Sequence, residues 1–349
     1  MNHKYVALDA LRGIAALLVA FSHAGIMFAG RPGMENVGLA VDFFFMLSGF
    51  VLAHAYGDRL AEGRLWDYLR ARVVRLFPLI ILGTLLGAAP YFANGRDPAL
   101  LLRLVAQGAV LLPEPSVSFS SNMFPFNPPA WSLFHEIIAS VLFGLGVWRG
   151  RLLVLPVILA SIALVWMILT KGTLDPGADF NHLHVGLIRV LFGFGVGVAL
   201  YRAKDVVNIR PIPLCILSIV FVGILLGPTE PWFLIIATFL LFPLLILSAA
   251  RSKPRFLRLA RLSGDLSYPI YTLHWPIYLW VIGAARVSGL AFSPALLAMF
   301  GLVATALGAF VILRIYDAPV RARLAPHRPP PGKAGAAKGS GRSPLERER

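Results

Sequence analysis

Residues 8–24 read LDALRGIAALLVAFSHA, an apolar stretch in which Arg12 and His23 are widely separated polar residues. His23 follows Arg12 by eleven positions, so at about 100° per residue both side chains lie on one face of a helix. At about 1.5 Å rise per residue they are about 16 Å apart along the helix axis. Ionisable groups inside a membrane span are costly and usually face a cavity or a functional path. The spacing therefore predicts a membrane helix that carries a cation and an imidazole at different depths.

The composition of the chain is that of a membrane protein. Of its 349 residues, 58% are hydrophobic and only 14% are charged, and the mean hydropathy is +0.75. Soluble domains carry about 25% charged residues. We predict an all-α integral membrane protein of about ten transmembrane helices, because a span needs about 20 apolar residues. The expected spans are 10–29, 38–56, 74–93, 130–148, 152–170, 184–201, 212–227, 231–249, 266–286 and 294–315.

The positive charges predict the orientation of the bundle. Lys and Arg gather in segments 57–75, 149–151, 202–210 and 251–261 and in the C-terminal tail, which are alternate connections. By the positive-inside rule both termini are cytoplasmic, in a multi-pass protein of the plasma or inner membrane. We attribute the net charge of +15 to orientation and to contact with anionic lipid rather than to nucleic-acid binding.

Two regions of the chain differ in character. Residues 1–319 form the predicted transmembrane domain, and residues 320–349 are predicted to be a disordered, basic cytoplasmic tail rich in Pro, Gly and Ala.

The single cysteine, Cys215, excludes an internal disulfide and any cysteine-based metal cluster. The scattered histidines lack metal-ligand spacing, so we expect no metal site. The connection 94–129 is a natural place to bind an acceptor or is a mere connector.

Ionisable residues fall at two depths of the predicted bundle. His23, Asp42, Glu136 and Arg189 share the outer level; Arg12, Arg70, Arg72 and Arg75 gather near the inner face; and His274 lies between the two levels. An inner basic cluster suits phosphates that arrive from the cytosol. An outer histidine beside carboxylates suits general-base chemistry. Plainer interpretations stay open: Arg72 and Arg75 as topology anchors, Asp42 and Arg189 as an ion pair that locks the bundle, and His23 as a structural histidine.

Six segments together carry a resemblance to a known family. They are LDALRGIAALLVAFSHA (8–24), GLAVDFFFMLSGFVL (38–52), YLRARVVRLFP (68–78), PAWSLFHEI (129–137), RVLFGFGVGVAL (189–200) and DLSYPIYTLHWPIY (265–278). In this order the chain resembles the membrane-bound acyltransferase-3 family of sugar O-acyltransferases, without the extra soluble esterase-like domain of some members. The spacing of Arg12 and His23 and the Arg72-x-x-Arg75 motif match the family's signatures, and Glu136 and His274 fall at positions that its pattern usually fills with those residues.

The resemblance implies transfer of an acyl group, commonly acetyl, from cytosolic acyl-CoA to a hydroxyl of a glycan or glycolipid at the outer face. Acyl-CoA is then a donor substrate, and no cofactor is bound permanently. Arg12, Arg72 and Arg75 would hold its phosphates. His23 would act as general base or transient acyl carrier, with Asp42 or Glu136 holding the imidazole in the reactive tautomer. We assign substrate contacts to Arg189, His274 and Trp131.

A different class of function also fits the ionisable residues that lie at several depths of the predicted bundle. A transporter or channel for an acyl donor, a lipid or protons would need the same buried ionisable groups. The sequence shows no internal symmetry of the transporter kind, which favours the enzyme. Measuring the loss of the acyl-CoA thioester distinguishes the enzyme from the transporter, because an enzyme consumes the thioester and a transporter leaves it intact.

Overall fold

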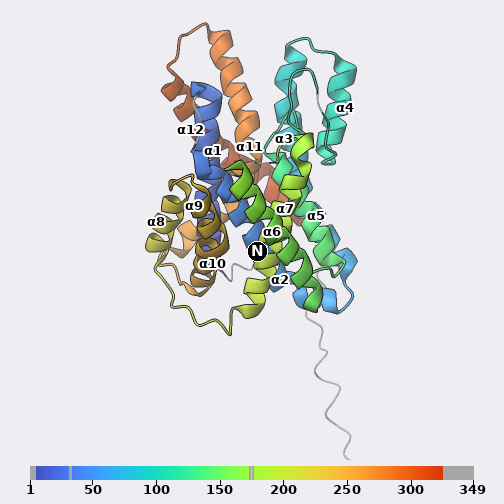
Figure 1. Ribbon diagram of the computed structural model, residues 1–349. Coiled ribbons are helices and arrows are strands. Elements are labelled where there is room, and N and C mark those ends of the chain that lie inside the picture. The colour runs from blue at the N-terminus through green and yellow to red at the C-terminus, as the bar shows by residue number, and fades with distance from the viewer. Residues whose placement is uncertain (1–4, 31–33, 116, 173, 175–176, 325–349) are drawn as a thin grey trace, which may run out of the picture.

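The computed structural model describes residues 5–30, 34–115, 117–172, 174 and 177–324 (Figure 1). Over these residues the chain is helical, without a β-strand. Its α-helices are α1 (Val6–Ala29), α2 (Leu39–Ala61), α3 (Leu65–Ala93), α4 (Pro98–Ala109), α5 (Ala130–Gly144), α6 (Val154–Lys171), α7 (Leu183–Ala203), α8 (Leu214–Leu225), α9 (Pro231–Ile236), α10 (Phe242–Arg251), α11 (Leu257–Ser288), α12 (Pro294–Ile312) and α13 (Ala318–Leu324). Short π-helical turns join α9 to α10 and α12 to α13.

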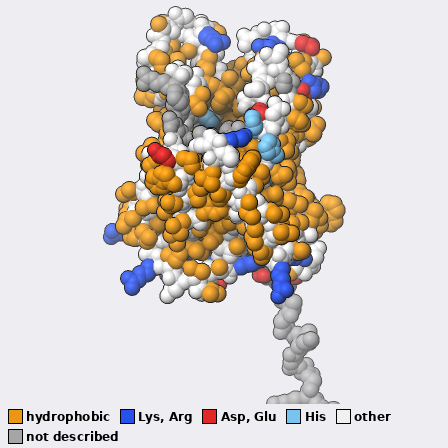
Figure 2. Space-filling model, in the orientation of Figure 1, with side chains coloured by type: hydrophobic (Ala, Val, Ile, Leu, Met, Phe, Trp, Pro, Cys, Tyr) orange, Lys and Arg blue, Asp and Glu red, His pale blue; other side chains and the backbone are white. Residues whose placement is uncertain are grey.

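The prediction of a helical membrane protein is confirmed, but the count of ten spans is not. Within the described residues, seven helical segments are long and apolar enough to cross a membrane: Val6–Ala29, Asn36–Ala61, Leu65–Ala93, Gly150–Lys171, Phe180–Ala203, Pro231–Arg251 and Pro294–Leu324. The helices α5 and α8, at the predicted spans 130–148 and 212–227, have only 15 and 12 residues. Helix α11 has the length but is more polar than the seven. Figure 2 shows hydrophobic side chains over the middle of the molecule and most Lys and Arg at its two ends.

Two helix pairs form the centre of the bundle. Helices α1 and α11 run side by side in the same direction, since Arg12 contacts Ser267 while His23, further along α1, contacts His274, further along α11. Helix α2 packs along α7. In Figure 1, α1, α11 and α12 form one upper arm of the molecule and α3 with α4 forms the other, and Figure 2 shows the surface hollowed between them. Of the predicted tail 320–349, residues 320–324 are helical, since they belong to α13, and the rest lies outside the described residues.

Prolines inside the helices release backbone carbonyls that distant side chains then use. Pro90 of α3 has no N–H for the carbonyl of Leu86, and the indole of Trp280 donates to that oxygen at 2.9 Å. Pro276 of α11 likewise frees the carbonyl of Thr272, which accepts a hydrogen bond from Asn127 at 3.0 Å. Such re-satisfaction is what makes proline tolerable inside a membrane helix. These two bonds tie α11 to α3 and to the loop that precedes α5.

Glycines allow α2 and α7 to approach closely. A Cβ placed on Gly197 would lie 1.9 Å from the backbone oxygen of Met46, and one on Gly49 would lie 2.0 Å from the oxygen of Phe194. Backbone atoms in a packed helix cannot give way cheaply, and small residues at such contacts are typical of membrane helices.

We therefore expect Gly197→Ala to destabilise the protein by about 1–3 kcal/mol, the usual cost of overpacking a tight contact. The measurement is thermal unfolding of the purified protein in detergent. Gly57→Ala is the control on α2, because a Cβ there meets nothing within 4 Å. An unchanged unfolding temperature for Gly197→Ala would show that the α2–α7 contact is looser than the structure indicates.

Candidate functional site

A pair of histidines lies at the contact between α1 and α11. The Nδ1 atom of His23 is 2.8 Å from Nε2 of His274. The two rings stack with centroids 5.1 Å apart and planes 8° apart, and the indole of Trp275 meets His23 edge-on at 5.5 Å. His274 is fully buried and His23 is half-buried. The sequence analysis placed both residues among the ionisable groups of the predicted bundle, and the structure brings them into direct contact.

The hydrogen bonds of His274 assign the tautomer of a neutral pair. Its Nδ1 is 3.0 Å from the carbonyl oxygen of Ile270, and because a carbonyl only accepts, Nδ1 carries the proton. Nε2 of His274 then accepts from Nδ1–H of His23. The Nε2 atom of His23 keeps its lone pair, which is the state that a general base or a nucleophile requires.

A cavity of about 550 Å³ lies on one side of the histidine pair and is called the arginine cavity here. Helices α1, α2, α3, α5 and α11 form its wall. Four arginines and two carboxylates line it, so its charge is net positive. Its ionisable and aromatic lining residues are Tyr5, Asp9, Arg12, Phe44, Phe45, His54, Tyr56, Arg59, Arg72, Arg75, Glu136, Tyr268 and Tyr271.

Arg12 is held at the α1–α11 contact. It donates to the hydroxyl of Ser267 at 2.8 Å and to the carbonyl of Gly264 at 2.9 Å, and it lies 3.3 Å from Asp9. Arg12, Arg72 and Arg75 share the wall of one cavity. The structure therefore brings together the three residues that the sequence assigned to phosphate binding.

The rim of the arginine cavity carries an aromatic group near the start of α1. Tyr5 packs edge-on against Phe50 and His54, and the ring of His54 is 3.2 Å from the hydroxyl of Tyr201. Burial, with smaller contributions from Tyr201 and Asp205, raises the pKa of Tyr5 to about 12. Its hydroxyl therefore stays protonated at neutral pH.

Glu136 is placed differently from the sequence-based expectation. It pairs with Arg72 at 2.6 Å and accepts a second hydrogen bond from Ser48 at 2.6 Å. The two depth levels assigned to Glu136 and Arg72 are thus one level. The reason is that α3 begins at Leu65 rather than near residue 74, which carries Arg72 two turns into the helix.

Asp42 is likewise remote from the imidazole that it was expected to orient. It forms a two-pronged ion pair with Arg189, at 2.9 and 2.8 Å, in which both side chains are almost completely buried. Among the described residues neither Asp42 nor Glu136 contacts His23, so the expected carboxylate–imidazole contact is not formed in this structure. His274 occupies the position at Nδ1 that a carboxylate was predicted to fill.

Two residues to which substrate contacts were assigned, Arg189 and Trp131, are buried side chains that line neither the arginine cavity nor the second cavity of the site. Arg189 is fully buried and donates in addition to the carbonyl of Gly38, while its guanidinium lies 5.5 Å from the ring of Trp131. Trp131 is buried and packs edge-on against Phe45. Both side chains lie in the packed interior, where the plainer interpretation of Asp42 and Arg189 as a locking ion pair describes what is seen.

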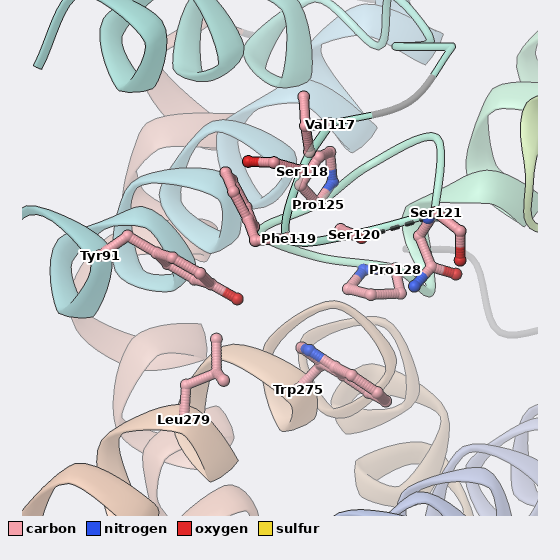
Figure 3. A pocket seen from close by; sticks show the side chains of 11 residues that line it. Tyr91, Val117, Ser118, Phe119, Ser120, Ser121, Pro125, Pro128, Trp275 and Leu279 are labelled. Carbon is pink, nitrogen blue, oxygen red and sulfur yellow. Dashed lines mark hydrogen bonds between the residues drawn. The ribbon is translucent and has the colours of Figure 1, made fainter. Parts of the chain in front are cut away.

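A second cavity, of about 500 Å³, opens on the other side of the histidine pair and is called the aromatic cavity here (Figure 3). Its wall comes from α3, from the loop before α5 and from α11. The lining residues are Tyr91, Val117, Ser118, Phe119, Ser120, Ser121, Asn122, Pro125, Pro128, Trp275 and Leu279.

Helix α11 connects the two cavities through the histidine pair. Tyr271 lines the arginine cavity, His274 follows one turn later, and Trp275 lines the aromatic cavity. Helix α3 also contributes to both cavities, through Arg75 and Tyr91, which lie about 24 Å apart along its axis. The histidine pair lines neither cavity itself but contacts Tyr271 of the positively charged cavity and Trp275 of the uncharged one.

Some residues of this arrangement were not singled out from the sequence. Trp275 stands next to His274, and Tyr271 lies in the same quoted segment, so their neighbourhood was a usable signal. Ser48 gave no signal, because one serine in an apolar helix is common. Among the described residues, no group of three or more His, Cys, Asp or Glu side chains is arranged to hold a metal ion.

Comparison with known proteins gives two matches. The sequence model of the acyltransferase-3 family, described as an acyltransferase domain, matches residues 5–314. The chain is similar to "Protein 2 in picA locus" of Rhizobium radiobacter, with 35% identity over 181 residues that cover 47% of this chain and 94% of that protein. No solved structure is significantly similar to the chain.

Proposed function

The chain belongs to the acyltransferase-3 family, and on that premise we propose that it transfers an acyl group, in the simplest case acetyl, from acyl-CoA to a hydroxyl of a glycan or glycolipid. The observation that supports this most is that the histidine pair contacts a residue of each cavity: His274 lies beside Tyr271 of the arginine cavity, and His23 lies beside Trp275 of the aromatic cavity. The donor would enter from the cytosol and the acceptor from the outer face of the plasma or inner membrane.

Acyl-CoA fits the arginine cavity by charge and by length. Its phosphates would be held by Arg12 and Arg75, with Arg72 fixed beside them by Glu136. Guanidinium groups bind phosphate oxygens in a two-pronged manner. The thioester arm would run along α1 toward His23, over the axial distance of about 16 Å that separates His23 from Arg12.

The chemical step follows from the tautomer of the pair. Nε2 of His23 takes the proton from the acceptor hydroxyl as its oxygen attacks the thioester carbonyl. The new C–O bond forms, the C–S bond breaks, and the leaving CoA thiolate takes the proton back from the imidazolium. His274 holds His23 in the required tautomer through the bond to Nδ1. In the covalent variant, Nε2 itself attacks the carbonyl and carries the acyl group before transfer.

Acyl transfer is tested with purified protein in liposomes and acetyl-CoA radiolabelled in its acetyl group. We expect loss of the thioester, with the label on an added glycan or in water as acetate. Movement of intact CoA across the bilayer without thioester loss would instead support a transporter.

The phosphate contacts give a prediction on donor affinity. Charged hydrogen bonds contribute about 1.5–3 kcal/mol, so we expect Arg75→Gln to raise the KM for acetyl-CoA roughly 10- to 100-fold. Arg64→Gln is the control, because Arg64 pairs with Asp67 on the surface outside the cavity. Steady-state kinetics with acetyl-CoA measures both. Equal KM values for the two variants would reduce Arg75 to a topology anchor.

A further inference from the structure

The aromatic cavity has a wall of unusual composition. Among the described residues that line it there is no Lys, Arg, Asp, Glu or His side chain. Aromatic rings come from Tyr91, Phe119 and Trp275, and hydroxyl or amide groups come from Ser118, Ser120, Ser121 and Asn122. Its volume of about 500 Å³ lies within the range of about 300–1,000 Å³ typical of small-molecule sites. The wall is built to contact an uncharged ligand with both apolar and hydrogen-bonding surfaces.

The positions of the rings suit a flat, saturated ring. In Figure 3, Tyr91 and Phe119 face the open space from one side, and Trp275 and Leu279 close it from below. The faces of aromatic rings are electron-rich and attract polarised C–H groups. A pyranose presents C–H groups on its faces and hydroxyls around its edge, so it can stack on such rings while serines and an amide bind its hydroxyls.

The cavity is held in shape by contacts outside its lining. Asn127 donates to the freed carbonyl of Thr272, which fixes the loop beside α11 one turn from Trp275. Arg103 of α4 donates two hydrogen bonds to the carboxylate of Glu114, at 2.8 and 3.2 Å. Because the loop is pinned at both sides, binding would require little ordering of the wall.

A cation, Arg96, lies close to two aromatic rings of the cavity wall. The guanidinium of Arg96 lies 4.5 Å from the ring centroid of Phe119 and 5.8 Å from that of Tyr91. A cation over an aromatic face is stabilised there. Arg96 therefore lies against two rings of the wall and is not itself among the residues that line the cavity.

We propose that the aromatic cavity is the acceptor subsite and that it selects an uncharged sugar residue, stacked between the Tyr91–Phe119 wall and Trp275. This inference rests on the proposed acyl transfer, because Trp275 also contacts His23 and so joins the subsite to the reacting group. An acidic sugar would have to bury a carboxylate against a wall without a cation, which is costly.

The test is binding of the full-length protein in nanodiscs, without donor, to an array of oligosaccharides. The array carries neutral hexose and N-acetylhexosamine oligomers and, at matched length, oligomers that contain uronic or sialic acid. We expect binding of neutral oligomers, and about tenfold weaker binding after either Tyr91→Leu or Trp275→Leu. Trp166→Leu, on the exposed surface of α6, is the matched control and should bind as the wild type does.

Failure of this inference can be told from failure of the proposed function. Preferred binding of acidic oligomers, no binding of neutral ones, or neutral binding that Tyr91→Leu leaves unchanged would each overturn the uncharged-sugar subsite, even if acetyl-CoA is consumed. Neutral binding without any thioester loss would preserve the subsite and overturn acyl transfer.

Discussion

Replacing His23 with alanine is expected to lower the rate of acyl transfer from acetyl-CoA by about 10²–10⁴-fold, the usual contribution of a positioned general base. The variant removes the only ring nitrogen of the pair that keeps a free lone pair, while His274 stays bonded to Ile270. The measurement is turnover of radiolabelled acetyl-CoA by protein in liposomes. His184→Ala is the control, since His184 lies exposed on α7 away from both cavities.

His274 gives the companion test, because it is proposed to act through His23. Loss of one hydrogen bond of about 1 kcal/mol should make His274→Ala slower by roughly fivefold, less than His23→Ala. The side-chain oxygen of glutamine can accept from Nδ1–H of His23, so His274→Gln should recover part of that loss with an unchanged KM. Full activity of His23→Ala would remove the histidine pair from the chemistry and direct attention to Glu136.

The sequence predicted the helices well because their signal is local. Each expected span coincides with a helix, since a run of apolar residues is legible without knowledge of its neighbours. The predicted lengths of two spans, 130–148 and 212–227, were too long. Helix α5 ends at Gly144, two residues before Gly146 with φ of 85°, and α8 ends just before Gly227 and Pro228. The orientation of the termini remains a prediction.

The partners of the polar residues could not be predicted, because they depend on which helices touch. His23 and His274 are 251 positions apart, and only the parallel packing of α1 and α11 brings them together. The sequence offered carboxylates as partners because they share a predicted depth. That depth failed for Arg72, which lies two turns inside α3 and meets Glu136 there.

Asp42→Ala is expected to destabilise the protein by about 3–5 kcal/mol, the cost of leaving one charge of a buried pair without its partner. Arg189 would remain at 0% exposure without the carboxylate of Asp42, which now accepts two hydrogen bonds from its guanidinium. That loss is a large fraction of a total stability of about 5–15 kcal/mol. Thermal and denaturant unfolding in detergent measure it. Asp67→Ala, which breaks the half-exposed pair with Arg64, should cost less than about 1 kcal/mol.

The double variant Asp42→Leu/Arg189→Met separates a structural from a functional role for the pair. With both charges gone, no uncompensated ion remains in the interior, so stability should recover most of the way to the wild type. If the pair only locks α2 to α7, acyl transfer should recover along with stability. If stability returns and activity does not, the pair acts on substrate after all, and the interior placement of Arg189 would describe only one state of a bundle that opens during turnover.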